Sequence, residues 1–78
     1  MIRIFNNKPE QVLSFSREKD GDRVVVAINL SSQPVDVILD SKNEMGKYTE
    51  LFSDKKYELK GNDEFRLGPW NYIVLAKN

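Results

Sequence analysis

Hydrophobic and polar residues alternate over Val12 to Glu18, with Leu13 and Phe15 on one face and serines on the other. This period of two is typical of a strand that is buried on one face, and it predicts that Leu13 and Phe15 point into the core. The following run, Val24 to Leu30, is apolar on both faces and predicts a central strand.

The residues between these two strands predict a tight hairpin. Asp20-Gly21 is a preferred central pair of a two-residue type I′ turn, which requires a positive φ at Gly21. The turn sets the pairs Leu13 with Ile28, Phe15 with Val26, Glu18 with Arg23 and Lys19 with Asp22. A slip of one residue would separate the apolar pairs, so the pattern specifies its own register. We expect Phe15 and Val26 to face each other in the core.

Further short strands are predicted at Val35 to Leu39, Tyr48 to Phe52, Tyr57 to Leu59, Phe65 to Leu67 and Tyr72 to Ala76. No segment has a helical period of useful length. The six or seven strands indicate an all-β fold, either an antiparallel sandwich or a partly open barrel. Residues 1–10 have no clean period and are predicted to be a linker or packing arm.

The amino-acid composition excludes several classes of function. Twelve basic and twelve acidic residues give zero net charge with the signs interspersed, which disfavours nucleic acid and anionic membranes as partners. The chain has no histidine and no cysteine, so thiol chemistry and every histidine-containing triad are excluded. The N-terminal residues lack a long apolar run, and we expect neither a signal peptide nor a membrane span there.

The acidic residues do not suggest an active site. The clusters are Asp20 with Asp22, Asp36 with Asp40, and Asp63 with Glu64. Each lies at a turn or on a polar face, where carboxylates form turns and increase solubility. Asp20-Gly21-Asp22 also lacks the length and the terminal Glu of a calcium-binding loop. We therefore assign no catalytic residue, no metal ligand and no cofactor.

Four segments in order resemble a known family: residues 12–17, the apolar strand ending in Asn29, residues 46–52 and the closing residues 67–75. Together they resemble the C-terminal β-domain, domain C, of the α-amylase family of glycoside hydrolases. The resemblance covers roughly residues 11 to 76. It implies a small antiparallel Greek-key β-sandwich at 11–78 that packs against a catalytic (β/α)₈ barrel of the same parent chain.

The resemblance also implies a function. The catalytic carboxylates of that family lie in the barrel and have no matching positions here, so the chain is expected to be a non-catalytic accessory domain of an enzyme acting on α-glucans. Its contact with the barrel is expected to be an exposed apolar patch. Our candidates for interface or glycan contact are Ile2, Ile4, Phe5 and Trp70.

Two alternatives remain open. The first is an independent starch- or glycan-binding module, in which at least two of the aromatic residues Trp70, Tyr48, Tyr57 and Tyr72 would be exposed and coplanar. The simpler interpretation is that Trp70 packs in the core or covers an interface. The second alternative, a free-standing enzyme, is disfavoured by the missing histidine and by the small interior of a sandwich.

Overall fold

A computed structural model describes residues 2–77, so Met1 and Asn78, the outer bounds of the predicted arm and domain, lie outside the described residues. The strands are β1 (Ile2–Arg3), β2 (Val12–Lys19), β3 (Asp22–Asn29), β4 (Val35–Asp40), β5 (Gly46–Glu50), β6 (Lys56–Leu59), β7 (Asn62–Leu67) and β8 (Tyr72–Lys77). The all-β antiparallel prediction is confirmed. The described residues hold eight strands because the two-residue β1 lies in the predicted arm.

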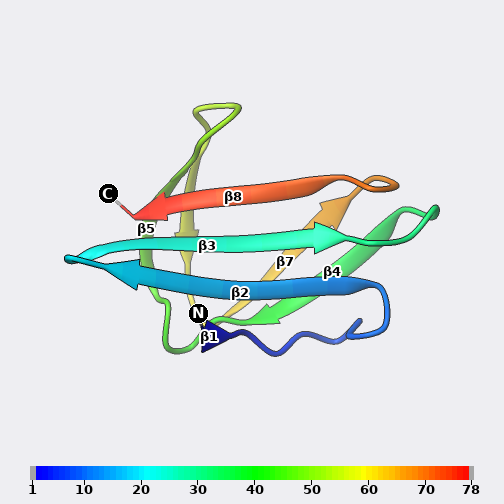
Figure 1. The fold of residues 1–78 in the computed structure, drawn as a ribbon, viewed down its shortest axis with the longest axis horizontal. Helices are drawn as coiled ribbons and strands as arrows, with labels where there is room; N and C mark the ends of the chain where they lie inside the picture. The colour runs from blue at the N-terminus through cyan, green and yellow to red at the C-terminus, as the bar shows by residue number, and fades with distance from the viewer. Residues whose placement is uncertain (1, 78) are drawn as a thin grey trace.

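The strands form two layers. One sheet has the order β1-β2-β3-β8-β5-β6, and the other contains β4 and β7, all pairs being antiparallel. In Figure 1, β4 and β7 cross obliquely behind β2, β3 and β8, while no element lies in front of these three strands. The six-stranded sheet, called the long sheet below, is therefore covered on one face only by the two-stranded β4–β7 sheet, called the short sheet.

The hairpin forms as the sequence predicts. Leu13 pairs with Ile28 and Phe15 with Val26, and the register continues to the turn. Asp20 and Gly21 have φ values of 53° and 85°, as a type I′ turn requires, so the prediction for Gly21 is confirmed.

The prediction of which hairpin face is buried is wrong. Ser14 and Ser16 point inward and are buried, whereas Leu13 and Phe15 are only half-buried on the opposite face. Beside Ser14 lies the arm residue Ile4, whose backbone N–H donates to Ser14 O (3.0 Å) and whose side chain is 2% exposed. Small serines on β2 leave room for Ile4 in the core, so the arm completes this face together with Val12 of β2.

The core lies between the two sheets. It consists of Ile4, Val12, Val25, Ala27, Val35, Val37, Leu39, Tyr48, Leu59, Phe65, Leu67, Ile73 and Leu75. The residues after β1 also join the sheets, because Asn6 pairs with Leu39 of β4 and Asp40 N donates to Phe5 O (2.8 Å). The domain thus has a core of its own, closed at one side by residues 2–7.

Candidate functional site

The uncovered face of the long sheet carries a continuous apolar surface, which we call the outer face. It is made by Leu13 and Phe15 of β2, Val24, Val26 and Ile28 of β3, and Tyr72, Val74 and Ala76 of β8. Cross-strand pairing places them in rows, such as Phe15–Val26–Val74 and Leu13–Ile28–Tyr72. Large contiguous apolar surfaces are rare on soluble monomers and mark interaction sites.

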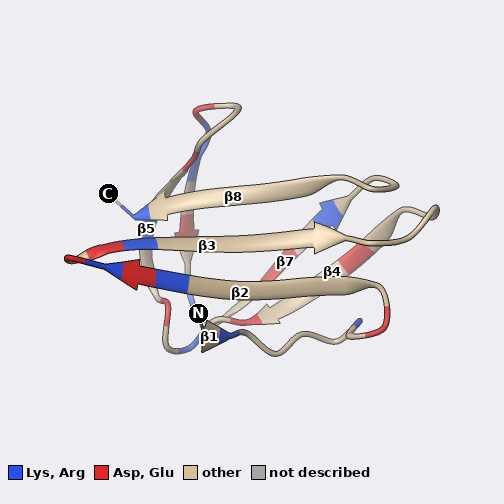
Figure 2. Cartoon of the chain, in the orientation of Figure 1, with Lys and Arg blue, Asp and Glu red and all other residues tan. Residues whose placement is uncertain are grey.

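The middle of the outer face carries no charged residues. In β2, β3 and β8 they gather at the hairpin end and at Lys77, while the rest of the three strands is uncharged (Figure 2). An apolar centre with charges at one border is the composition expected of a protein interface, since charged residues are depleted where an interface is fully buried.

A turn after β5 extends the outer face at its β8 side. Leu51 N donates to Val74 O (2.9 Å), and the Phe52 ring meets Tyr72 edge to face with centroids 5.6 Å apart. Glu50 holds this turn: one carboxylate oxygen accepts from Phe52 N and Ser53 N (both 2.9 Å), and the other accepts from Val74 N (3.0 Å).

These hydrogen bonds control the ionisation of Glu50. Burial by itself would raise the pKa of this carboxyl, but the donors from Val74, Ser53 and Phe52 outweigh it and lower the pKa below its ordinary value of 4.5. Since the pKa is lower in the folded chain than in the unfolded chain, the stabilisation is present above pH 4.5 and is lost as the pH falls through the folded value.

We predict that Glu50→Gln destabilises the chain at pH 7 by about 1–2 kcal/mol, because a neutral amide replaces a charged acceptor of several hydrogen bonds. The variant should also lose less stability than the parent when the pH is lowered from about 5 to about 3. Urea unfolding at both pH values measures this, with Glu58→Gln on the exposed side of β6 as the control. Parallel pH profiles for Glu50→Gln and the parent would contradict the role of the carboxylate.

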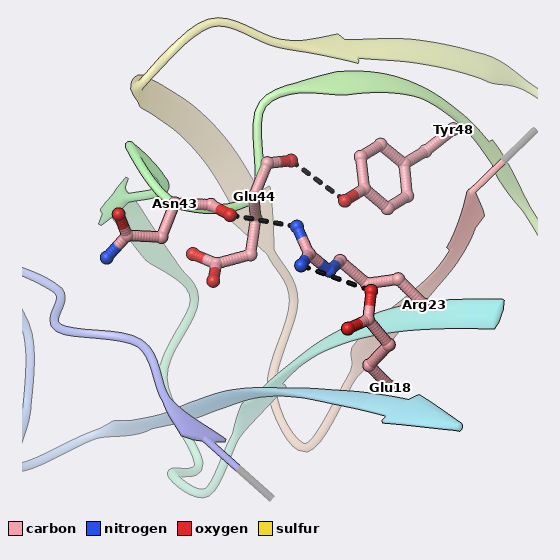
Figure 3. Close-up of polar contacts among 5 residues, drawn as sticks. All are labelled: Glu18, Arg23, Asn43, Glu44 and Tyr48. Atoms are coloured by element: carbon pink, nitrogen blue, oxygen red, sulfur yellow. Dashed lines mark hydrogen bonds and ion pairs between the residues drawn. The ribbon is translucent and has the colours of Figure 1, made fainter. Parts of the chain in front are cut away.

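A second polar cluster ties the hairpin to the loop before β5 (Figure 3). Arg23 donates to Asn43 O (2.8 Å) and pairs with Glu18 (3.3 Å), and Tyr48 OH donates to Glu44 O (2.8 Å). Burial raises the pKa of Tyr48, partly offset by Arg23. A buried phenol that already donates to a backbone carbonyl holds a loop in place, and it is not positioned to transfer protons to a ligand.

Two of the acidic residues considered in the sequence, Asp36 and Asp63, form contacts within the domain. Asp63 accepts from Lys60 N (2.9 Å), Gly61 N (3.3 Å) and the Ser41 hydroxyl, and Asp36 pairs with Arg66 (3.8 Å). Over residues 2–77, no group of three His, Cys, Asp or Glu side chains is arranged to hold a metal ion. The same residues contain no helix long and apolar enough to cross a membrane.

The sequence-predicted contact residues lie apart. Ile4 is part of the core, whereas Ile2 is 61% exposed on β1 and Phe5 is 74% exposed beside a hollow of about 270 Å³ that Asn7, Ile38 and Asp40 help to line. Trp70 is 63% exposed in the β7–β8 connection. This connection lies at the end of the sandwich opposite the β2–β3 turn (Figure 1).

Sequence reasoning missed the outer face. The run from Val24 to Leu30 could have indicated it. A strand that is apolar on both faces is expected to be packed against other elements on both faces.

Comparison with known proteins identifies a family to which the chain is similar. Residues 2–74 match the family described as Maltogenic Amylase, C-terminal domain. No curated protein matches the chain significantly.

Proposed function

Because the chain belongs to the maltogenic amylase C-terminal domain family, we propose that it is a non-catalytic accessory domain of an α-amylase-like glycoside hydrolase acting on α-glucans. In this proposal the domain packs against the catalytic (β/α)₈ barrel of the same parent enzyme and stabilises it. The match covers nearly the whole length and supports the resemblance to domain C seen in the sequence.

The outer face is the observation that carries the proposal. The hairpin places serines inward and Leu13 and Phe15 outward, an inversion that would be unfavourable if the outer face met only water. Covering this face removes its apolar area from water, at roughly 25 cal/mol per Å². An interface between domains of one chain usually measures about 600–1,500 Å². The barrel's outer ring of helices offers a surface of suitable size.

A charge in the centre of the outer face should prevent docking. We predict that Val26→Glu weakens binding to the separately expressed barrel by about a hundredfold or more, because it buries an unpaired carboxylate. The free chain should keep its fold, since Val26 is only half-buried. Titration calorimetry measures the binding, and circular dichroism the fold. Ile38→Glu, on the opposite side of the sandwich, is the matched control.

The outcome separates the possibilities. Loss of binding in Val26→Glu with retention in Ile38→Glu supports docking through the outer face. Equal binding by all three chains, or no binding by the unaltered chain, would contradict the proposal.

The alternative is an independent starch- or glycan-binding module. Of the four aromatic residues considered, Tyr48 is buried and Tyr57 packs against Phe65, with centroids 5.7 Å apart. Tyr72 is exposed, but its partner Phe52 lies at 89° to it, so the pair does not form a flat platform for a sugar ring. Trp70 and Tyr72 are the two exposed members of the four, so the glycan-binding alternative depends on this pair. The family match favours the accessory domain.

A further inference from the structure

The β7–β8 connection holds Trp70 in an unusual backbone conformation. Asn71 N donates to Gly68 O (3.0 Å), which closes a four-residue turn with Pro69 second and Trp70 third. Trp70 has a φ of 58°, and a type II turn requires a positive φ at its third position. Glycine or asparagine normally occupies that position because a bulky side chain is strained there.

Neighbouring groups keep the turn in this strained form. Trp70 N donates to Ser31 O (3.0 Å) in the β3–β4 loop. The buried Asn29 side chain donates to Gly68 O (2.9 Å) and to Gln33 O (2.7 Å), so it fastens both loops together. A strained residue persists only where its surroundings enforce it, and such residues cluster at functional sites.

Most of Trp70 lies outside the core of the domain. It is 63% exposed, so burial in the chain's own core does not offset the strain. Glycine would form the same turn without this strain, and the exposed indole therefore needs a different explanation.

The turn is continuous with the outer face. Beyond the Ile28–Tyr72 pair, Asn29 N donates to Asn71 O (2.8 Å), and Trp70 then bonds to Ser31. The backbone of Trp70 thus lies against the β3–β4 loop, in which Leu30 is 54% exposed. Residues 30–34 and 68–71 contain no charge in a chain of which 31% is charged. The uncharged surface thus extends past the ends of β3 and β8.

We propose that Trp70 is the anchor of the docking interface, an indole presented by a strained turn to an apolar pocket of the catalytic barrel, with Leu30 of the neighbouring loop as a second apolar contact. This inference rests on the proposed function. Tryptophan is among the residues most enriched at the energetic centres of interfaces. A turn fixed before binding reduces the entropy lost on docking. The strain is therefore retained because it fixes the position of the indole.

Two substitutions separate anchoring from strain. Trp70→Ala removes the indole and keeps a side chain at positive φ, whereas Trp70→Gly removes the indole and also relieves the strain. We expect both variants to bind the barrel at least about tenfold more weakly than the unaltered chain. In thermal unfolding of the free chain, we expect Trp70→Gly to melt at a higher temperature than Trp70→Ala. Ile38→Ala, on the opposite side of the sandwich, should bind normally.

Each result has a distinct meaning. If the unaltered chain binds the barrel and both Trp70 variants bind equally well, the anchor role alone is overturned. If the unaltered chain does not bind, the proposed function falls and this inference with it. The chain has one tryptophan, so fluorescence of the free chain during titration with maltooligosaccharide reports on Trp70 alone. A saturable change there would identify a glycan as the occupant and also overturn the anchor role.

Discussion

Replacing Leu75 by alanine is expected to destabilise the chain by about 2–5 kcal/mol, a large part of the roughly 5–15 kcal/mol that stabilises a typical domain. Leu75 is fully buried between Val25 of β3 and Glu50 of β5, in the middle of the long sheet. Phe15→Ala removes more atoms, yet it should cost only about 1–2 kcal/mol in the free chain because Phe15 is half-buried on the outer face.

Urea unfolding of the two variants tests this ranking, which is the reverse of the order expected from side-chain size. If each variant unfolds in one cooperative step, its unfolding free energy should depend on urea concentration with the same slope as that of the parent. Phe15→Ala proving more destabilising than Leu75→Ala would show that the hairpin is packed the other way round, with Phe15 in the core.

Asn29→Ala is expected to destabilise the chain by about 2–4 kcal/mol, since buried polar groups left without partners cost about 1–3 kcal/mol each. Asn29 is fully buried, and its amide donates to carbonyls of Gln33 and Gly68. Its carbonyl oxygen accepts from Ser31 N (3.0 Å) and Ser31 Oγ (2.8 Å). Alanine removes all of these hydrogen bonds at the end of the sandwich, and of the groups involved the Ser31 hydroxyl and Gln33 O keep a hydrogen bond to each other (3.0 Å).

Asn71→Ala is the matched control, because Asn71 lies in the same region but is exposed. Its side-chain oxygen accepts only from Tyr72 N (3.1 Å) in the described structure, and its removal should change stability by about 0.5 kcal/mol or less. Thermal or urea unfolding of both variants gives the comparison. Similar small losses for Asn29→Ala and Asn71→Ala would mean that the buried amide does not hold the two loops.

The candidate site was only partly predictable. The sequence identified Trp70 as a contact residue but not its strained turn, because Gly68-Pro69 indicates a turn without specifying which residue takes the positive φ. It grouped Ile4 with the exposed candidates, although Ile4 completes the core above Ser14. The outer face was missed because Leu13 and Phe15 were expected to point inward.

Local residue patterns were sufficient to predict the all-β class, the hairpin register and the positive φ at Gly21, because strand period and turn chemistry act between residues close together in the chain. Which face of the hairpin is buried could be seen only in the folded domain. β3 is apolar on both faces, so alternation could not choose between them, and the choice depended on Ile4 and on the short β4–β7 sheet packing over the serines. Burial depends on contacts between segments distant in the chain, which the local pattern of residues does not contain.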